Sequence, residues 1–375
     1  MPTHLLMTAD AVGGVWTYAT DLAAGLSAHG IETTLAVLGP QPTDVQREQA
    51  TAIPGLVLLE TGLPLDWLSD ADATRRSARA LARLAERRDV DMVHLNSPTL
   101  AASPDWTVPR VGVVHGCISA WWQAACPDEP LPADLGWHRR MMSRGLAACD
   151  RVIAPSAAFA ATVRALYRLR EMPGVVHNGR TWPLDRQSPQ LAGGVLTAGR
   201  LWDRVKNTAV LDAVAARLPV PLEAAGPTAG PHGESCAPRH MRLLGDLDHA
   251  TLLARMASRP VFVSAARFEP FGLAVLEAAA HGCPLVLSDI PTFRELWDGA
   301  ALFAPVDCDA EFAARIQELL DDPRQRLAMG ELARTRAARY GVARMATAMM
   351  REYRAILRRP PGEPVPERRQ GRVAA

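Results

Sequence analysis

Several features that would identify a class of protein are missing from this sequence of 375 residues. Its six cysteines are scattered without a Cys-x-x-Cys pair, so their spacing indicates neither a zinc knuckle nor a disulfide framework, and we expect a reducing, cytoplasmic setting. No apolar run approaches about 18 residues, and the first residues lead into a strand without the basic segment of a signal peptide. A formal net charge of +1 supplies no field that would attract nucleic acid.

The composition is that of a globular protein with more than one core. Apolar residues make up 48% of the chain and charged residues 22%. Because a single core seldom grows beyond about 250 to 300 residues, the chain is expected to hold two domains. The motifs H-E-x-x-H and G-x-S-x-G do not occur, so the sequence does not support a zinc peptidase or a serine hydrolase.

Short apolar runs alternate with helical stretches through the first half of the chain, which is the pattern of a doubly wound parallel α/β sheet. Strands are expected at residues 4–8, 34–38, 56–59, 92–95, 111–115 and 151–154. Helices are expected at residues 15–29, 71–88, 135–148 and 156–169, and Ser156 is a plausible N-cap for the last of them.

A run of breaking residues at 177–194 indicates a linker, after which a second alternation begins. Its expected strands are 195–198, 222–225, 241–244, 261–263, 285–287 and 301–303, with helices starting from Lys206, Asp248, Gly272, Asp309 and Pro323. We predict two domains of the same class, with ligands bound at the carboxyl ends of the strands in the cleft between them. The predicted division is an N-terminal domain at 1–180, a C-terminal domain at 181–341, a final helix at 342–358 and a disordered tail at 359–375.

Residues 261–277 are expected to form a buried strand, a turn and a helix. Glu269 then lies in the turn and Glu277 in the helix, while the amides of Gly272 and Leu273 are free at the helix N-terminus, where anions bind. Such a place suits a sugar and an anion together. The two carboxylates fit a glycosidase pair as well, or a helix-capping charge and a solvated residue. Against a solvated residue, the helix around Glu277 is almost wholly apolar, so a carboxylate buried there needs a hydrogen-bonding partner.

Lysine occurs once among the 41 basic residues, at Lys206, and the other 40 are arginine. Arg200 and Lys206 lie six residues apart between an expected strand and the next helix. A compact ammonium suits phosphate as a point charge, whereas arginine presents a planar fork. We predict that the two cations neutralise a diphosphate; a chance placement of the single lysine stays an alternative.

Other polar and glycine residues follow expected strands. Gly13 and Gly14 would let the backbone approach a phosphate, although a plain tight turn explains them equally well. His115 ends another strand at the ligand-binding edge, where a lone histidine is more often structural. The Asp-x-Asp triplets at 89–91, 246–248 and 307–309 are expected to be capping residues, and no metal site is predicted. The arginine-rich stretch at 75–88 is expected to be a solvated helix face, with a weak peripheral contact to an anionic membrane as the alternative.

With these residues in place, the chain resembles the retaining glycosyltransferases of the GT-B fold, in which two Rossmann-like domains face each other across a cleft, and within them glycosyltransferase family 4. The most specific match is Phe268-Glu-Pro-Phe-Gly-Leu-Ala-Val-Leu-Glu277, which is similar to the family's Glu-x7-Glu signature. Supporting matches are Gly13-Gly14, His115, Asn178-Gly179, Gly199-Arg200 with Lys206, and Gly226-Pro227.

The resemblance implies a role for each matched residue. Arg200 and Lys206 would grip the donor diphosphate, assisted by the amide of Gly14, and Glu277 would bind the hydroxyls of the nucleotide ribose. The donor sugar would meet His115 from the N-terminal domain and, from the other domain, Glu269 with the amides of Phe271, Gly272 and Leu273. The final helix would cross back to pack on the N-terminal domain.

The implied activity is that of a metal-independent hexosyltransferase without a cofactor. It would move a sugar from a UDP-, GDP- or ADP-sugar to a hydroxyl acceptor, which would be a glycan, a lipid-linked acceptor or a small molecule, with retention of the anomeric configuration. The departing phosphate would take the acceptor proton. Two alternatives are a sugar-nucleotide epimerase of the same fold and a catalytically silent subunit that binds sugar nucleotides.

Two positions depart from the family's pattern. Ala265-Ala266 stand where Pro-Ser is usual, and Arg180 follows Asn178-Gly179 where an apolar residue and then an aspartate are usual. These changes touch the linker and the mouth of the nucleotide pocket. Acceptor contacts are expected in the N-terminal loops, where Trp121-Trp122 either stack on a sugar or pack against the protein.

Overall fold

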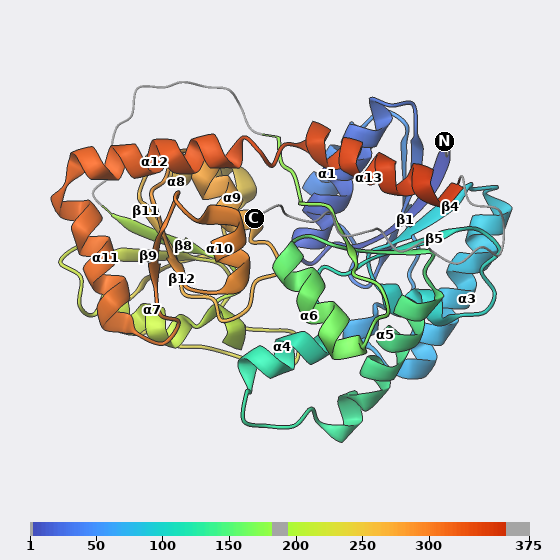
Figure 1. Cartoon of the computed structure of the whole chain (residues 1–375), viewed down its shortest axis with the longest axis horizontal. Coiled ribbons are helices and arrows are strands. Elements are labelled where there is room, and N and C mark those ends of the chain that lie inside the picture. The colour runs from blue at the N-terminus through green and yellow to red at the C-terminus, as the bar shows by residue number, and fades with distance from the viewer. Residues whose placement is uncertain (1–2, 182–193, 358–375) are drawn as a thin grey trace, which may run out of the picture.

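The computed structural model describes residues 3–181 and 194–357, which form two α/β domains (Figure 1). The N-terminal domain has a parallel sheet of seven strands in the order β3-β2-β1-β4-β5-β6-β7, and the C-terminal domain has a parallel sheet of six in the order β10-β9-β8-β11-β12-β13. In both sheets the strand order reverses beside the first strand of the domain, which is the property of a doubly wound fold. The predicted fold class is therefore confirmed.

The N-terminal domain contains every strand predicted for it. Its strands are β1 (His4–Asp10), β2 (Glu32–Leu38), β3 (Leu56–Glu60), β4 (Met92–Leu95), β5 (Arg110–Val113), β6 (Arg151–Ala154) and β7 (Gly174–Val175). Its helices are α1 (Gly14–Ser27), α2 (Asp44–Thr51), α3 (Ala71–Arg87), α4 (Ile118–Ala125), α5 (Gly136–Ala148) and α6 (Ala157–Tyr167). Ser156 caps α6 by accepting from the amide of Phe159, as predicted.

Three elements of this domain lie outside the predictions. Strand β7 has only two residues, which is too short for an apolar pattern to reveal. Helix α2 begins with a capping box of Thr43 and Gln46, a local signal that the sequence does contain. Helix α4 is capped by the Cys117 thiol and lies in the segment expected to be an acceptor loop.

The C-terminal domain also follows the predicted alternation. Its strands are β8 (Val195–Ala198), β9 (Leu222–Ala225), β10 (Arg242–Gly245), β11 (Val261–Ser264), β12 (Leu285–Ser288) and β13 (Leu302–Ala304). Its helices are α7 (Thr208–Ala215), α8 (His249–Ala257), α9 (Leu273–Ala280), α10 (Pro291–Trp297), α11 (Asp309–Asp321) and α12 (Pro323–Ala337). Helix α7 begins two residues later than predicted, because Arg204–Lys206 form a 3-10 turn and Asn207 takes a left-handed conformation at φ 58°.

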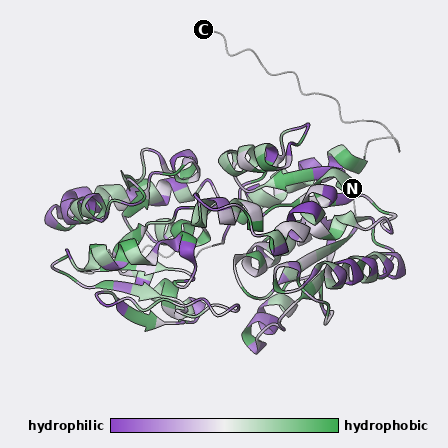
Figure 2. Ribbon diagram, turned by 90° about the horizontal axis from the view of Figure 1, so that it is seen from below, coloured by the Kyte–Doolittle hydropathy of each residue, from purple (hydrophilic) through white to green (hydrophobic). Residues whose placement is uncertain are grey.

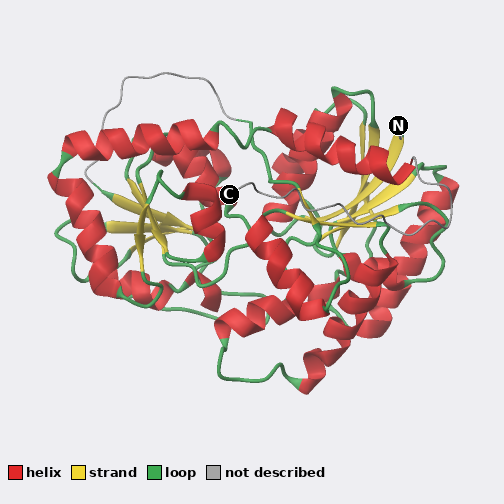
Figure 3. Cartoon of the chain, viewed as in Figure 1, coloured by secondary structure: helices red, strands yellow, loops and turns green. Residues whose placement is uncertain are grey.

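Each sheet is covered by helices on both faces, as the secondary-structure colours of Figure 3 show. Strands buried on both faces need apolar side chains throughout, and the strands of the N-terminal sheet are largely hydrophobic in Figure 2. The largest fully buried side chains include Tyr18, Phe159, Phe262, Trp297 and Tyr353. The apolar cores fix the strands, and the turns that follow the strands carry polar side chains.

The chain returns from the C-terminal domain to the N-terminal domain near Gly341. After α12, helix α13 (Val342–Leu357) lies over the N-terminal domain and packs on α1 (Figure 1). At the contact a Cβ on Gly25 would lie 2.8 Å from the Ala346 Cβ, so the two helices approach as closely as glycine permits. The predicted tail at 359–375 and most of the predicted linker lie outside the described residues.

Candidate functional site

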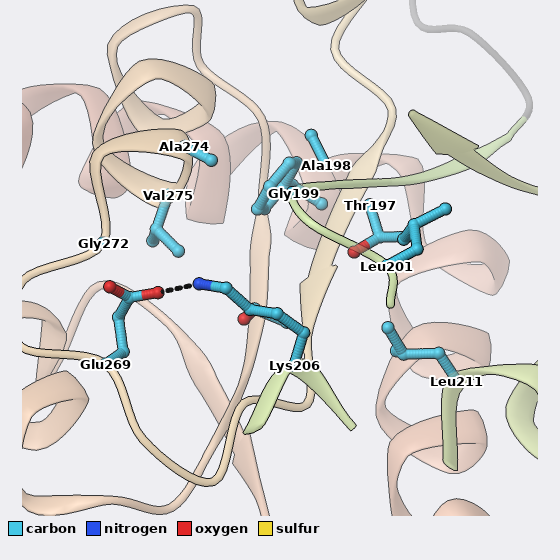
Figure 4. A pocket seen from close by; sticks show the side chains of 12 residues that line it. Thr197, Ala198, Gly199, Leu201, Lys206, Leu211, Glu269, Gly272, Ala274 and Val275 are labelled. Carbon is cyan, nitrogen blue, oxygen red and sulfur yellow. Dashed lines mark hydrogen bonds and ion pairs between the residues drawn. The ribbon is translucent and has the colours of Figure 1, made fainter. Parts of the chain in front are cut away.

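The turn after β8 and the turn after β11 bring Lys206 and Glu269 together (Figure 4). Lys206 Nζ lies 2.5 Å from Glu269 Oε2, and the side chains are 24% and 16% exposed. The pair lies in a pocket whose wall includes Gly199, Gly272 and Val275. An ammonium carries three N–H donors, so Lys206 has two beyond the one facing Glu269 with which to bind an anion.

Arg200 lies in the same turn as Lys206 and is held by Asp203. Its Nη2 lies 2.9 Å from Asp203 Oδ2, and its guanidinium stacks over the Trp202 ring at 5.5 Å. The other carboxylate oxygen of Asp203 accepts from Trp121 Nε1 of helix α4, across the cleft, at 2.8 Å. The Asp203 side chain is 2% exposed, whereas Arg200 is 46% exposed. A buried carboxylate thus orients a cation whose head stays accessible.

Two helix N-termini face each other at this place. Gly14 begins α1 in the N-terminal domain, and a Cβ on it would lie 3.2 Å from the Leu273 Cδ1 at the start of α9. Gly272 caps α9 at φ 90°, where its added Cβ would meet Glu269 and Phe293 at 3.2 Å. Both constraints favour glycine, and the amides of a first helical turn attract negative charge. The predicted residues Gly13 and Phe271 adjoin these two turns.

His115 lies two residues after the end of β5. Its Nε2 lies 2.8 Å from Asn96 Oδ1, and the same oxygen lies 3.1 Å from His94 Nε2. Asn96 Nδ2 donates to the Thr8 carbonyl oxygen, which orients the amide so that its oxygen faces both histidines. His94 Nδ1 in turn lies 2.6 Å from the Tyr353 hydroxyl of α13. Both imidazoles therefore carry their proton on Nε2.

Burial keeps these two histidines neutral. It lowers the pKa of His94 to about 4, and together with the nearby His94 it lowers the pKa of His115 to about 3. In this tautomer Nδ1 of His115 is an acceptor. At neutral pH His115 therefore offers a hydrogen-bond acceptor and no positive charge.

Glu277 lies in the second turn of α9 with its side chain 12% exposed, so the bland interpretation as a solvated helix residue is wrong. Its Oε1 lies 2.8 Å from Arg180 Nη2 and 3.0 Å from His249 Nε2. Burial raises the pKa of Glu277, but the contacts with His249 and Arg180 outweigh it and hold the pKa below its usual range. The partner that a buried carboxylate needs is thus an arginine from the segment that joins the domains.

Of the predicted site residues, Lys206, Glu269 and Gly272 line one pocket within the described chain, and sequence reasoning missed several of the groups that hold the predicted residues in place. Asn96 had a signal as a polar residue directly after β4, and Asp203 as a polar residue in the turn that follows β8. His249 had none, because its contact with Glu277 depends on how α8 and α9 pack. Trp121 lies against Asp203, and Trp122 Nε1 donates to the Glu129 carbonyl oxygen, so both indoles pack and bond within the protein.

Of the Asp-x-Asp triplets, one supplies a helix cap as predicted, since Asp248 caps α8. Asp91 instead accepts from the amides of Thr3 and His4, which are distant in the sequence, and Asp307 pairs with Arg267. No group of three or more His, Cys, Asp or Glu side chains within residues 3–181 and 194–357 is arranged to hold a metal ion. In that part of the chain no helix combines the length and apolar character needed to cross a membrane. The arginines of α3 are exposed and its buried side chains are mostly alanine and leucine, an arrangement that fits a solvated face and a peripheral membrane contact alike.

Two family models match this chain in sequence. The model described as Glycosyltransferase Family 4 matches residues 12–180, and the model described as Glycosyl transferases group 1 matches residues 192–322. A glycogen synthase of Mycobacterium tuberculosis is 29% identical over 263 residues, which span 62% of this chain and 61% of that enzyme. A phosphatidyl-myo-inositol mannosyltransferase of Mycolicibacterium smegmatis is 34% identical over 120 residues, 31% of each chain. The chain thus spans about three fifths of the length of the glycogen synthase it matches.

Solved structures share the architecture over nearly the whole chain. A sucrose-phosphate synthase from Thermosynechococcus elongatus superposes with a TM-score of 0.73 at 17% identity and covers 95% of this chain and 99% of its own. The Anabaena protein HepE, solved with UDP-glucose, gives a TM-score of 0.70 at 18% identity and covers 94% of this chain and 99% of its own. At such identities the likeness shows the fold.

Proposed function

We propose that this chain is a group 1 glycosyltransferase of the GT-B fold, and that it transfers a glycosyl group from a nucleoside-diphosphate sugar to a hydroxyl acceptor with retention of the anomeric configuration. The observation that carries the proposal is the contact between Lys206 and Glu269 at 2.5 Å. It joins a cation suited to phosphate and a carboxylate suited to sugar hydroxyls, beside two helix N-termini.

In the proposed reaction the bond between the anomeric carbon and the diphosphate oxygen breaks, and the acceptor oxygen bonds to that carbon on the same face. The acceptor proton moves to the departing diphosphate. Arg200 and Lys206 stabilise the negative charge that grows on the leaving group. The protein itself thus supplies the positive charge that a metal ion would otherwise provide. Glu269 and the neutral His115 hold the sugar hydroxyls, and Glu277 holds the ribose.

The donor sugar has to place its diphosphate between the start of α1 and the turn at residues 199–206. A Cβ on Gly14 would lie 3.2 Å from Leu273 Cδ1 there, and this closeness supports an anion site shared by the amides of both first turns. HepE was solved with UDP-glucose, which makes UDP-glucose the first donor to try. GDP-sugars and ADP-sugars are the other donors to test.

The test is a donor screen with purified protein. We expect slow release of nucleoside diphosphate from one donor without acceptor, faster release with an acceptor, and the same rates in EDTA. NMR of the glycoside product should show the donor's anomeric configuration. A product of inverted configuration would refute retention, and a chain that neither binds nor cleaves any of the donors would refute the proposed activity.

A further inference from the structure

Arg180 lies where the chain leaves the N-terminal domain. Its amide donates to the Tyr340 carbonyl oxygen at 3.0 Å, and its backbone pairs with Gly341 in the segment by which the chain returns. Beside it, Gly179 has no room for a side chain, because a Cβ would lie 2.6 Å from the carbonyl atoms of Gly341. The backbone of Arg180 is therefore held at the point where the two crossing segments touch.

The Arg180 guanidinium joins carboxylates from both domains. Nη1 donates to Asp21 Oδ2 in α1 at 2.7 Å, and Nη2 lies 2.8 Å from Glu277 Oε1 in α9. His249 at the start of α8 lies 3.0 Å from the same Nη2 and the same Oε1. Arg180 and Glu277 are each 12% exposed and Asp21 is 17% exposed, so little water screens these charges.

The Arg180 guanidinium has different effects on the pKa values of Asp21 and Glu277. Burial raises the pKa of Asp21, and the neighbouring Arg180 only partly opposes this. For Glu277 the effect of burial is smaller than that of its contacts with His249 and Arg180, which keep the pKa low and the group ionised. Glu277 therefore depends on its two partners for the charge with which it would accept ribose hydroxyls.

Of the two carboxylate oxygens of Glu277, the geometry leaves Oε2 for a ligand. Arg180 and His249 both contact Oε1, and no residue in the described ranges 3–181 and 194–357 hydrogen-bonds to Oε2. A carboxylate anchored by one oxygen accepts hydroxyl groups with the other. Asp21, the anchor of Arg180, lies in α1, the helix whose first turn would face the donor in the proposed function.

We propose, building on the donor site described above, that Arg180 is a positioning residue for the nucleotide. It holds Glu277 by Oε1, ionised and turned toward the ribose hydroxyls, and its bond to Asp21 makes this arrangement depend on the placement of α1. Arg180 acts through Glu277 and does not touch the transferred sugar. Its loss should therefore affect ligands that contain a ribose and spare those that lack one.

The experiment measures the affinity of two probes for wild-type chain and variants. One probe is whichever of UDP, GDP and ADP the wild type binds most tightly, and the other is inorganic pyrophosphate, which has no ribose. Arg180→Ala is expected to weaken the nucleotide about tenfold to a hundredfold, the usual effect of losing a hydrogen bond to a charged group. Pyrophosphate affinity should stay unchanged. Arg180→Lys should fall between, because one ammonium cannot span both carboxylates.

A matched control is Arg151→Ala, which removes another partly buried ion pair, between Arg151 Nε in β6 and Glu352 Oε2 toward the C-terminal end of α13, at 2.6 Å. It should leave both affinities unchanged, and thermal midpoints show whether each variant is folded. The 2′,3′-dideoxy form of the nucleotide should bind the wild type more weakly than the nucleotide, but should show no such difference with Arg180→Ala.

Three other results would overturn the inference, and each has a different meaning. Equal losses for nucleotide and pyrophosphate mean that Arg180 only maintains the fold, and an unchanged nucleotide affinity in both Arg180 variants means that it does not position Glu277. In either case the donor site itself stands. A wild-type chain that binds none of the three nucleotides overturns the proposed function and, with it, this inference.

Discussion

Replacing the single lysine by arginine tests the donor site most sharply, because it keeps the charge and changes only its shape. Lys206 Nζ lies 2.5 Å from Glu269 Oε2, and on its other side a Cβ on Gly199 would lie 3.8 Å from Lys206 Cε. A longer side chain with a planar head must displace Glu269 or turn out of the pocket. Either movement takes the charge away from the leaving group.

The expected size of the effect follows from electrostatic stabilisation. Removal of one preorganised donor to a developing anion costs about 2.7 to 4 kcal/mol, or about 10² to 10³ in kcat. We expect this loss of about 10² to 10³ in kcat for Lys206→Ala, and a loss of at least about tenfold in kcat for Lys206→Arg. The assay is nucleoside diphosphate release at saturating donor. Arg204→Lys, an exposed cation in the same turn, is the matched control and should retain activity.

Two results would contradict the reasoning. If Lys206→Arg keeps the wild-type kcat, either cation can act at this position, and the placement of the single lysine has no functional reason. If Lys206→Ala keeps it, Lys206 does not meet the leaving group at all. A loss shared by Arg204→Lys would point to damage of the whole turn.

Three further predictions concern the frame around the site. Gly179→Ala should lower the unfolding free energy by about 1 to 3 kcal/mol in urea titrations, because the added Cβ overlaps the Gly341 carbonyl at 2.6 Å; an unchanged midpoint would contradict it. Tyr353→Phe should cost about 1 to 3 kcal/mol by leaving the buried His94 Nδ1 without its hydroxyl partner, again read from urea midpoints. Between pH 6.5 and pH 4 stability should fall by up to about 1.4 kcal/mol per pH unit for each of His94 and His115, because the unfolded chain binds protons that these histidines, with folded pKa values of about 4 and about 3, do not bind. His94→Gln should remove about half of that slope, and an equal slope would refute the assignment.

The alternation of apolar runs was enough to predict both sheets, because strands covered on both faces need continuous apolar residues and strands of this kind are separated by helices. It also placed Glu269 in the turn before α9 and Glu277 inside that helix. The pattern failed where an element has little apolar periodicity of its own. Strand β7 is too short to show one, and α4 owes its place to packing beside α6 and the turn at 204–206.

The candidate site was predictable as a set of strand ends but not as a set of contacts. The Lys206 turn and the Glu269 turn follow β8 and β11, which are neighbours in the sheet, so topology brings them to one edge. The tautomer of His115 depends instead on Asn96, and Asn96 is oriented by the Thr8 carbonyl oxygen of another strand. Such chains of hydrogen bonds arise only when the strands are placed.

Glu277 shows the limit of local reasoning most clearly. Its apolar neighbours in α9 indicate burial, and an ionised carboxylate cannot be buried without partners because desolvation costs several kcal/mol. The sequence therefore requires a donor but does not say which of the 40 arginines supplies it. Arg180 precedes Glu277 by 97 positions, and the domain crossing brings it into contact with both Glu277 and Asp21. A departure from the family's pattern and a buried charge without a local partner are two separate clues in the sequence, and the structure joins them in one ion pair.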